Sequence, residues 1–399
     1  MVLETPFHPR TQALATSRRW KEWSGYAAVC TFDAHLDREY FAIRQSAGLL
    51  DASPLFKFEI AGPDSAAFLD HVWSRRVSRL RPGRVAYGCW CDDSGAVLDD
   101  GTITRLDDER WRMTSAEPAL AWLLERSRGF DVRLEDVSTD LAALSLQGPT
   151  SREIVRAVFG ERAAELRFFG GCEANLVIGK RRCGAYVTRT GYTGDLGYEI
   201  WLPAAEALTA WDALMEAGAP HGITPQGLDA LDVARIEAGF LLNGVEYKGA
   251  KAARIPSQKS TPFELGLDWC VDLDREPFVG QAALRPEAAR GPRRRLVGLV
   301  ADWDETERLF DAVGLPPEMP AGAWRDGRPV FDGARQIGYA TSGAWSPTLK
   351  KNLALATVEA RYATPGTVLR LELTVEYERK SVRAVVTPRP FFDPPRKRA

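Results

Sequence analysis

Residues 189–201 read RTGYTGDLGYEIW, two strand-like ends joined by a loop that contains three glycines. Gly191, Gly194 and Gly197 permit positive φ angles and close approach of the backbone to another group. Both properties suit a loop that wraps around a ligand. An ordinary glycine-rich hairpin has the same pattern, and the spacing leaves both interpretations open.

The strand after this loop places a carboxylate among apolar residues. Period-2 alternation sets Glu199 and Trp201 on one face and Tyr198 and Ile200 on the other. A carboxylate is costly to bury unless a cationic or amide-like group meets it. We therefore expect Glu199 either to be partly exposed or to face a polar ligand.

The composition is that of an ordinary globular protein. Of 399 residues, 45% are hydrophobic and 27% charged, and this length suits two or three domains. Lys+Arg 52 against Asp+Glu 54 gives a net charge of −2, so we expect no nucleic-acid partner. We interpret the basic runs at 293–295 and 395–398 as solvated surface. Without a membrane-length apolar run or a signal-peptide core, the sequence predicts a soluble, cytoplasmic protein with no membrane partner.

The cysteines and histidines form no recognisable metal or redox motif. Six cysteines and four histidines are scattered without a C-x-x-C or H-E-x-x-H pattern. Cys89 and Cys91 share one face of a predicted strand, where we expect them to be small buried hydrophobes. P-loop, nucleophile-elbow and dinucleotide-binding motifs are also absent. The sequence thus predicts no metal site and none of the common nucleotide or triad chemistries.

Helix and strand patterns alternate irregularly over the first 290 residues. A helical stripe within 36–50 is predicted to stop near Gly48. Further helices are predicted from Pro203 at the first helical position to Gly218, and from a Thr224-Pro225 cap to Gly239. Strand patterns fall at 55–62, 85–91, 97–106, 110–115 and 141–149. This order favours an α+β fold over a doubly wound parallel sheet.

From about residue 293 the chain consists of short strands separated by Asp-Gly, Ser-Gly and Pro-Gly turns. The pattern predicts a separate all-β domain, joined to the rest by the Pro/Gly/Arg-rich stretch 288–294. Residues 302–324 are expected to form a helix and loop inserted in that domain.

Two adjacent carboxylates lie in SGAVLDDGTIT, residues 94–104. On extended backbone Asp99 and Asp100 face opposite sides, so only one of them points easily into a pocket. Asp-Gly is also a strong hairpin-turn signal, and a plain turn stays open as an alternative. A carboxylate beside a bound amine orients it and stabilises its positive charge.

Seven sequence stretches, spread over nearly the whole chain, occur in an order that is characteristic of one protein family. They are FAIRQSAGLLDAS, VAYGCWCDDSGAVLDDG, LSLQGPT, TRTGYTGDLGYEIW, RIEAGF, TPFELGLDWCVDLDREPFVGQAAL and IGYATSGAWSPTLKKNLALATV. In this order the chain resembles the aminomethyltransferase (glycine-cleavage T-protein) family of tetrahydrofolate-dependent one-carbon transferases. The resemblance implies an α+β fold of three domains packed as a cloverleaf around a central folate channel, with a C-terminal domain that is all-β and barrel-like. The implied domains are 1–52 with 140–245, 53–139 with 246–287, and 291–399.

The resemblance implies two polar site residues. Glu199 matches the glutamate that grips the pterin of tetrahydrofolate, since two carboxylate oxygens suit the paired N–H donors of that ring. Asp100 matches the catalytic aspartate near the folate N5 and N10 atoms. There it positions and polarises the amine that takes up the one-carbon unit.

Aromatic residues complete the implied folate pocket. Tyr87 and Tyr192 match pocket tyrosines, and Phe240 matches an aromatic wall. Phe169, with Phe168 as the alternative, matches another wall position. Each of them is equally compatible with core packing, because the direction of an aromatic side chain is not readable from sequence.

Two positions depart from the family pattern. Ser53-Pro54-Leu55-Phe56 stands where T-proteins have Ser-His-Met-Gly, so a histidine is missing. Leu231 stands where T-proteins have an arginine that helps to hold folate, and a leucine there is similar to the folate domains of dimethylglycine and sarcosine dehydrogenases. The stretch 242–260 is also longer and more basic than its T-protein equivalent and borders the donor side of the channel.

We therefore predict a tetrahydrofolate-dependent transferase that moves a methyl or aminomethyl-derived unit from an N-, O- or S-linked donor to folate N5. Because of the two departures, our first hypothesis for its activity is a demethylase of a small methylated compound. A glycine-cleavage aminomethyltransferase acting on a lipoyl carrier protein is the nearest alternative, with residues 248–259 and 293–295 contacting an acidic carrier. A non-catalytic folate-binding assembly factor is the third.

Overall fold

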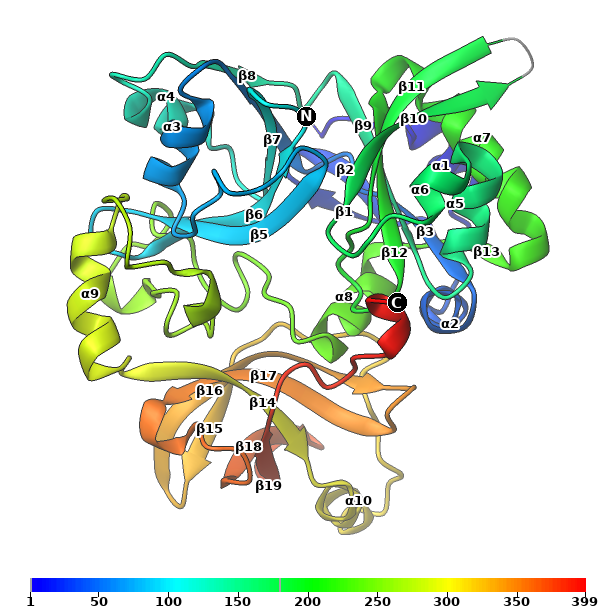
Figure 1. Cartoon of the computed structure of the whole chain (residues 1–399). Coiled ribbons are helices and arrows are strands. Elements are labelled where there is room, and N and C mark those ends of the chain that lie inside the picture. The colour runs from blue at the N-terminus through cyan, green and yellow to red at the C-terminus, as the bar shows by residue number, and fades with distance from the viewer. Residues whose placement is uncertain (1, 179–180) are drawn as a thin grey trace.

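Three β-sheet bodies surround a common centre in the computed structural model of the chain, which describes residues 2–178 and 181–399 (Figure 1). Two are open sheets and the third is a closed barrel. A separate hairpin joins β1 (Arg19–Trp23) to β2 (Tyr26–Thr31). Short 3₁₀ helices are η1 (Ala204–Glu206), η2 (Ala219–His221), η3 (Pro256–Gln258), η4 (Asp268–Cys270), η5 (Ala360–Tyr362) and η6 (Pro395–Lys397). The predicted α+β fold with a C-terminal barrel is confirmed, whereas the domain bounds stay a prediction.

The first open sheet has the strand order β10-β11-β12-β9-β3-β13. Its strands are β3 (Ala47–Asp51), β9 (Leu141–Gln147), β10 (Gly171–Ile178), β11 (Arg181–Thr188), β12 (Gly197–Pro203) and β13 (Ile223–Pro225). Neighbours are antiparallel, except that β13 runs parallel to β3. The helices beside it are α1 (His8–Leu14), α5 (Ser151–Phe159), α6 (Glu161–Ala164) and α7 (Ala207–Gly218).

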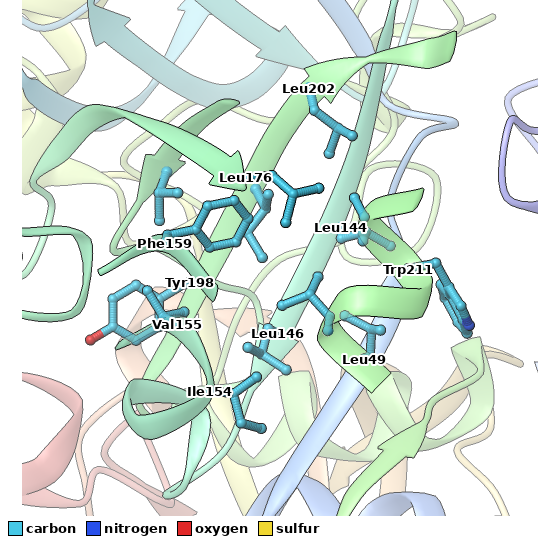
Figure 2. Packing of buried hydrophobic residues seen from close by; sticks show 14 of the residues in the cluster. Leu49, Leu144, Leu146, Ile154, Val155, Phe159, Leu176, Tyr198, Leu202 and Trp211 are labelled. Atoms are coloured by element: carbon cyan, nitrogen blue, oxygen red, sulfur yellow. The ribbon is translucent and has the colours of Figure 1, made fainter. Parts of the chain in front are cut away.

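Figure 2 shows the core between this sheet and its helices, with Leu144 and Leu146 of β9 beside Tyr198 and Leu202 of β12. Tyr198, Ile200 and Leu202 all belong to this core, so β12 alternates as the sequence predicts. Glu199 and Trp201 consequently lie on the opposite face of the sheet.

The second open sheet has the order β5-β6-β7-β4-β8. Its strands are β4 (Phe56–Ala61), β5 (Arg84–Cys91), β6 (Val97–Arg105), β7 (Arg110–Ser115) and β8 (Arg133–Asp136), and its helices are α3 (Ser65–Val72) and α4 (Leu120–Arg126). In the β5–β6 hairpin Cys89 pairs with Asp100, and the Asp-Gly pair lies inside β6 rather than in the turn. The alternative of a plain Asp-Gly turn is therefore wrong. Cys89 and Cys91 are buried in one apolar cluster, as expected.

The barrel closes in the order β14-β17-β16-β15-β18-β19. Its strands are β14 (Arg294–Ala301), β15 (Arg328–Asp332), β16 (Arg335–Ser346), β17 (Lys351–Glu359), β18 (Val368–Val375) and β19 (Glu378–Thr387). The inserted helix is α10 (Trp303–Asp311), and α9 (Gln281–Arg290) precedes the barrel.

Two helices pack between the first sheet and the barrel: α2 (Asp37–Gln45) contacts the sheet, and α8 (Leu228–Glu237) contacts both α2 and the barrel. α8 contacts α2, β2, β16 and β17, and all its residues except Asp229 are buried. On α2, Arg44 donates to Glu237 of α8 and to the Thr193 carbonyl of the glycine-rich loop at 3.0 Å. Arg396, near the C-terminus, donates to Asp195 of the same loop at 2.7 Å. The glycine-rich loop is thus held between α2 and the end of the chain.

Three predicted helix limits are wrong. The stripe at 36–50 ends as α2 at Gln45, because residues 47–51 pair with β9. Pro203 is the last residue of β12, opposite Leu141, and α7 begins at Ala207. Residues 223–225 pair with β3, so α8 begins only at Leu228. In each case tertiary strand pairing overrides a local helix signal.

Candidate active site

A cavity of about 650 Å³ lies where the three bodies meet. Its wall comes from β5 and β6, from the glycine-rich loop and β12, from α8, and from the segment after β19. All six site residues predicted from the sequence lie on this wall: Tyr87, Asp100, Phe169, Tyr192, Glu199 and Phe240. The fold therefore gathers them in one place, although four separate parts of the chain supply them: the β5–β6 hairpin, the segment before β10, the glycine-rich loop with β12, and the segment after α8.

Glu199 lies on the cavity side of β12 and is half-buried. Thr190 Oγ1 donates to Glu199 Oε2 at 2.5 Å, the only hydrogen bond to this carboxylate within residues 2–178 and 181–399. Burial raises the pKa of Glu199, because the charged form loses its hydration. The carboxylate consequently has acceptor capacity left for a donor that enters the cavity.

The glycine-rich loop wraps around the side-chain amide of Gln147, which is fully buried. A Cβ on Gly191 would lie 2.0 Å from Gln147 Oε1, and a Cβ on Gly197 would lie 2.1 Å from it. Gly194 alone of the three has a positive φ, +74°. Gln147 Nε2 donates to the Thr190 carbonyl at 3.2 Å. Gly191 and Gly197 therefore allow the loop to approach Gln147 closely, and Gly194 allows a positive φ. Together they place Thr190 beside Glu199.

Asp99 and Asp100 diverge from β6, as adjacency on a strand predicts. Asp99 is buried and accepts hydrogen bonds from the backbone N–H groups of Ala116 and Glu117 at 3.0 and 2.9 Å. Asp100 lies on the cavity wall, where Tyr87 Oη donates to its Oδ2 at 2.6 Å. Burial, and next the charge of Asp99, raise the pKa of Asp100 to about 7. A carboxyl group of this pKa both holds and releases protons near neutrality.

Sequence reasoning misses two residues of this carboxylate cluster. Tyr247 Oη hydrogen-bonds Asp100 Oδ1 and lies 3.1 Å from Asp99 Oδ1. Asn243 Nδ2 donates to Asp99 Oδ1 at 2.8 Å. Both belong to the stretch 242–260, which the sequence marks only as long and basic. The available signal was that this stretch borders the donor side of the implied channel, and that signal does not single out a tyrosine.

Stacked and edge-on aromatic rings form much of the remaining wall. The rings of Tyr192 and Phe240 lie 5.6 Å apart at 28°. Phe168 and Phe169 meet edge to face at 4.7 Å, and Phe169 has a φ of +57°, which is uncommon for a bulky residue. Both phenylalanines line the cavity, so the structure leaves the choice between them open.

Leu231, the second departure, lines the cavity in an apolar cluster with Leu228. Cations nevertheless border this end of α8. Arg325, from the barrel body, donates through Nε to Asp232 at 2.7 Å, and both Arg325 and Lys21 lie on the cavity wall. The cavity wall therefore carries positive charge from Lys21 and Arg325, although position 231 is a leucine.

At the first departure, Pro54 is buried after β3, and Leu55 lines the cavity. Ser53 Oγ accepts the N–H of Ala143 at 3.1 Å, which ties this turn to the first sheet. Along the described part of the chain no histidine lines the cavity.

The basic C-terminal run belongs to the cavity wall, so its interpretation as solvated surface is wrong for Lys397. This side chain is buried, its Nζ lies 5.2 Å from the centre of the Phe240 ring, and burial lowers its pKa. The sequence does not reveal this placement, because the carboxylate that accepts from Arg396, Asp195, is distant in the chain.

The described residues form neither a metal-binding group nor a membrane-spanning helix. Outside the gaps at residues 1 and 179–180, no group of three or more His, Cys, Asp or Glu residues is placed to hold a metal ion. Among the same residues no helix has the length and apolar character to cross a membrane.

Comparisons with known proteins place the chain in a family. The GCVT N-terminal domain matches residues 10–275, and the glycine cleavage T-protein C-terminal barrel domain matches residues 311–393. An aminomethyltransferase of Geobacillus thermodenitrificans is 35% identical over 376 residues, 93% of each chain. One of Herpetosiphon aurantiacus is 35% identical over 395 residues, 98% of each chain. The solved glycine cleavage system aminomethyltransferase T of Bartonella henselae has the same fold, with a TM-score of 0.81, 24% identity, and coverage of 98% of this chain and 99% of that one.

Fold, cavity and relatives together define a tetrahydrofolate-dependent one-carbon transferase. The chain belongs to the aminomethyltransferase (glycine-cleavage T-protein) family, as the resemblance implied. The cavity fits tetrahydrofolate: its volume is within the ~300–1,000 Å³ usual for small-molecule sites. Aromatic rings line it, and the carboxylate of Glu199 has acceptor capacity to spare.

Proposed function

We propose that this protein transfers an aminomethyl carbon from a lipoyl carrier protein to tetrahydrofolate. The relatives support this donor better than the small methylated compound placed first from the sequence, since full-length matches carry the name aminomethyltransferase. The observation that carries the proposal is that two carboxyl groups of different character share one cavity. Asp100 has a pKa of about 7, and Glu199 has acceptor capacity left for a ligand. A non-catalytic folate-binding assembly factor would need the Glu199 anchor but not the titratable Asp100.

Glu199 is the proposed anchor for the pterin of tetrahydrofolate. The paired N–H groups of a pterin suit a carboxylate with spare acceptor capacity, and such charge-assisted bonds are strong in a buried site. Tyr192 and Phe240 provide a stacked aromatic wall, and Tyr87 and Phe169 border the same space. We assign these five residues to folate binding.

Asp100 is the proposed polar group at the reacting atoms. Tetrahydrofolate supplies nitrogen atoms that accept the carbon. When a sulfur-bound aminomethyl group gives its carbon to two such N–H groups, the sulfur leaves as a thiol and the amine as ammonia. Both leaving groups need a proton, and Asp100, hydrogen-bonded by Tyr87 and Tyr247, is able to relay one at neutral pH. Holding donor and acceptor together supplies the rest of the rate enhancement.

The basic stretch 248–259 is the proposed contact for the carrier. It lies against the strand of the catalytic carboxyl, because the Ala250 N–H donates to the Val97 carbonyl at 2.8 Å. Lys248, Lys251 and Arg254 are exposed along it. Complementary charge of this kind speeds encounter with an acidic carrier domain.

The donor is tested by supplying aminomethyl-loaded lipoyl carrier protein and tetrahydrofolate to the purified enzyme. We expect 5,10-methylene-tetrahydrofolate and ammonia to form in equal amounts, with free thiol on the carrier. Failure to form both products from loaded carrier, under conditions where tetrahydrofolate binds, contradicts the proposal.

A demethylase remains the second candidate, because Leu231 places an apolar side chain on the cavity wall where the family has an arginine. The same assay distinguishes it. A panel of N-, O- and S-methylated small compounds replaces the carrier, and formation of 5-methyl-tetrahydrofolate from one of them, with none from loaded carrier, favours the demethylase.

A further inference from the structure

One large aromatic side chain on the cavity wall is exposed instead of buried. Trp269, in η4, is 62% exposed and lines the cavity. Among the described residues, no other strongly exposed large hydrophobic side chain lies on this wall. Neither the predicted site residues nor the proposed folate contacts include it. An exposed tryptophan at the rim of a cavity is typical of a contact residue, since this side chain offers a large apolar area with little conformational freedom to lose.

Trp269 is held in place despite its exposure. Its ring stacks on Tyr87, with ring centres 6.0 Å apart and planes at 23°. The guanidinium of Arg75 lies 5.7 Å from the Trp269 ring centre and donates to the Tyr87 carbonyl at 3.2 Å. The next residue, Cys270, is buried, and its carbonyl accepts from Ser74 Oγ at 2.9 Å. Trp269 is therefore a fixed part of the rim.

Tyr87 connects this rim to the reacting carboxyl. The Tyr87 ring stacks on Trp269, and its hydroxyl donates to Asp100 at 2.6 Å. A donor whose reacting carbon reaches Asp100 from outside along this wall consequently passes Tyr87 and then Trp269. Glu199, the proposed pterin anchor, lies on a different strand of the cavity wall, β12.

We propose that Trp269 binds the arm of the lipoyl donor, its methylene chain and sulfur atoms, and so helps to select that donor. This inference rests on the proposed function. Methylene groups lose water against an indole ring, and sulfur makes favourable contacts with aromatic rings. A cationic donor suits this place poorly, because Arg75 already brings a positive charge to the same ring.

The test compares two donors that share the arm but differ in what carries it: aminomethyl-loaded lipoyl carrier protein and free aminomethyl-dihydrolipoamide. Trp269→Ala is expected to raise the KM of both donors by roughly 10-fold, as truncation of a contact aromatic does. Its kcat and its Kd for tetrahydrofolate should stay within about 2-fold of wild type, which also shows that the variant is folded. Trp269→Phe should restore most of the KM. Tyr377→Ala, at a 98% exposed position on the barrel, is the matched control and should change nothing.

An unchanged KM for both donors in Trp269→Ala overturns the inference. A rise confined to the carrier protein overturns it too, since Trp269 then contacts the body of the carrier and not the arm. These outcomes are distinct from failure of the proposed function, in which the wild-type enzyme itself turns over neither donor.

Discussion

Asp99 and Asp100 are consecutive residues of one strand, yet only Asp100 lines the cavity, whereas Asp99 accepts backbone N–H groups from the chain after β7. Four hydrogen-bond donors face Asp99: Asp100 N, Ala116 N, Glu117 N and Asn243 Nδ2. Burial raises the pKa of Asp99 itself, whereas these donors favour its charged form. The charge of Asp99 adds to burial in raising the pKa of Asp100 to about 7. The buried neighbour thus prepares the cavity-facing carboxyl for proton transfer.

Replacing Asp100 with asparagine keeps the shape of the side chain and removes its acidity. We expect kcat to fall by roughly 10²- to 10⁴-fold, the usual contribution of acid–base catalysis, while the Kd for tetrahydrofolate changes little. Steady-state kinetics and calorimetry measure the two quantities. Asp93→Asn, in the exposed turn of the same hairpin, is the matched control and should keep full activity. Wild-type turnover in Asp100→Asn removes Asp100 from the mechanism.

Tyr247→Phe tests the proposed acid–base group through pH dependence. The Tyr247 hydroxyl lowers the pKa of Asp100 by donating to its anion, so its removal should move the pKa of Asp100 further above 7. The inflection that this group gives to the pH profile of kcat/KM should shift upward. Tyr186→Phe removes another buried tyrosine hydroxyl, one that has no hydrogen-bond partner among the described residues, and should leave the profile in place. A profile equally unaffected by Tyr247→Phe contradicts the assignment.

The raised pKa of Asp100 also makes stability depend on pH. Its ordinary value is 3.8 and its folded value about 7, so the folded protein binds more protons between these values. The stability associated with protonated Asp100 is complete below pH 3.8 and is lost as the pH rises through 7. Asp100→Asn has no such loss. Its melting temperature relative to wild type should therefore be higher at pH 8 than at pH 5, and a difference that does not change with pH contradicts the burial of this carboxyl.

Gly197→Ala tests the close approach between the glycine-rich loop and Gln147. The added Cβ would lie 2.1 Å from Gln147 Oε1, so the loop or the buried amide must move. We expect destabilisation of about 1–3 kcal/mol, as for an overpacked core, together with weaker folate binding. Gly184→Ala, in the neighbouring strand β11, meets nothing within 4 Å and should be tolerated. Denaturant unfolding of both variants measures the difference, and equal stability refutes the packing account.

Local pattern was sufficient to predict the face on which Glu199 lies and the divergence of the two aspartates, because strand alternation depends only on neighbouring residues. It failed where distant strands pair: Pro203 closes β12 and residues 223–225 join β3, although both carry helix-start signals. Tyr247 and Trp269 could not be found either, since loop residues acquire their neighbours only through tertiary packing. Resemblance to a family supplied the site residues that alternation alone left ambiguous.

Calorimetric titration of tetrahydrofolate into wild type and Glu199→Gln tests the central claim most directly. Glutamine has the shape of glutamate but only one acceptor oxygen and no charge, so it mismatches the paired donors of a pterin. We predict a Kd at least about 10-fold higher, the equivalent of ~1.4 kcal/mol. Glu22→Gln, an exposed carboxylate on the same cavity wall, should bind as wild type does. Unchanged affinity in Glu199→Gln would contradict the placement of the pterin at Glu199.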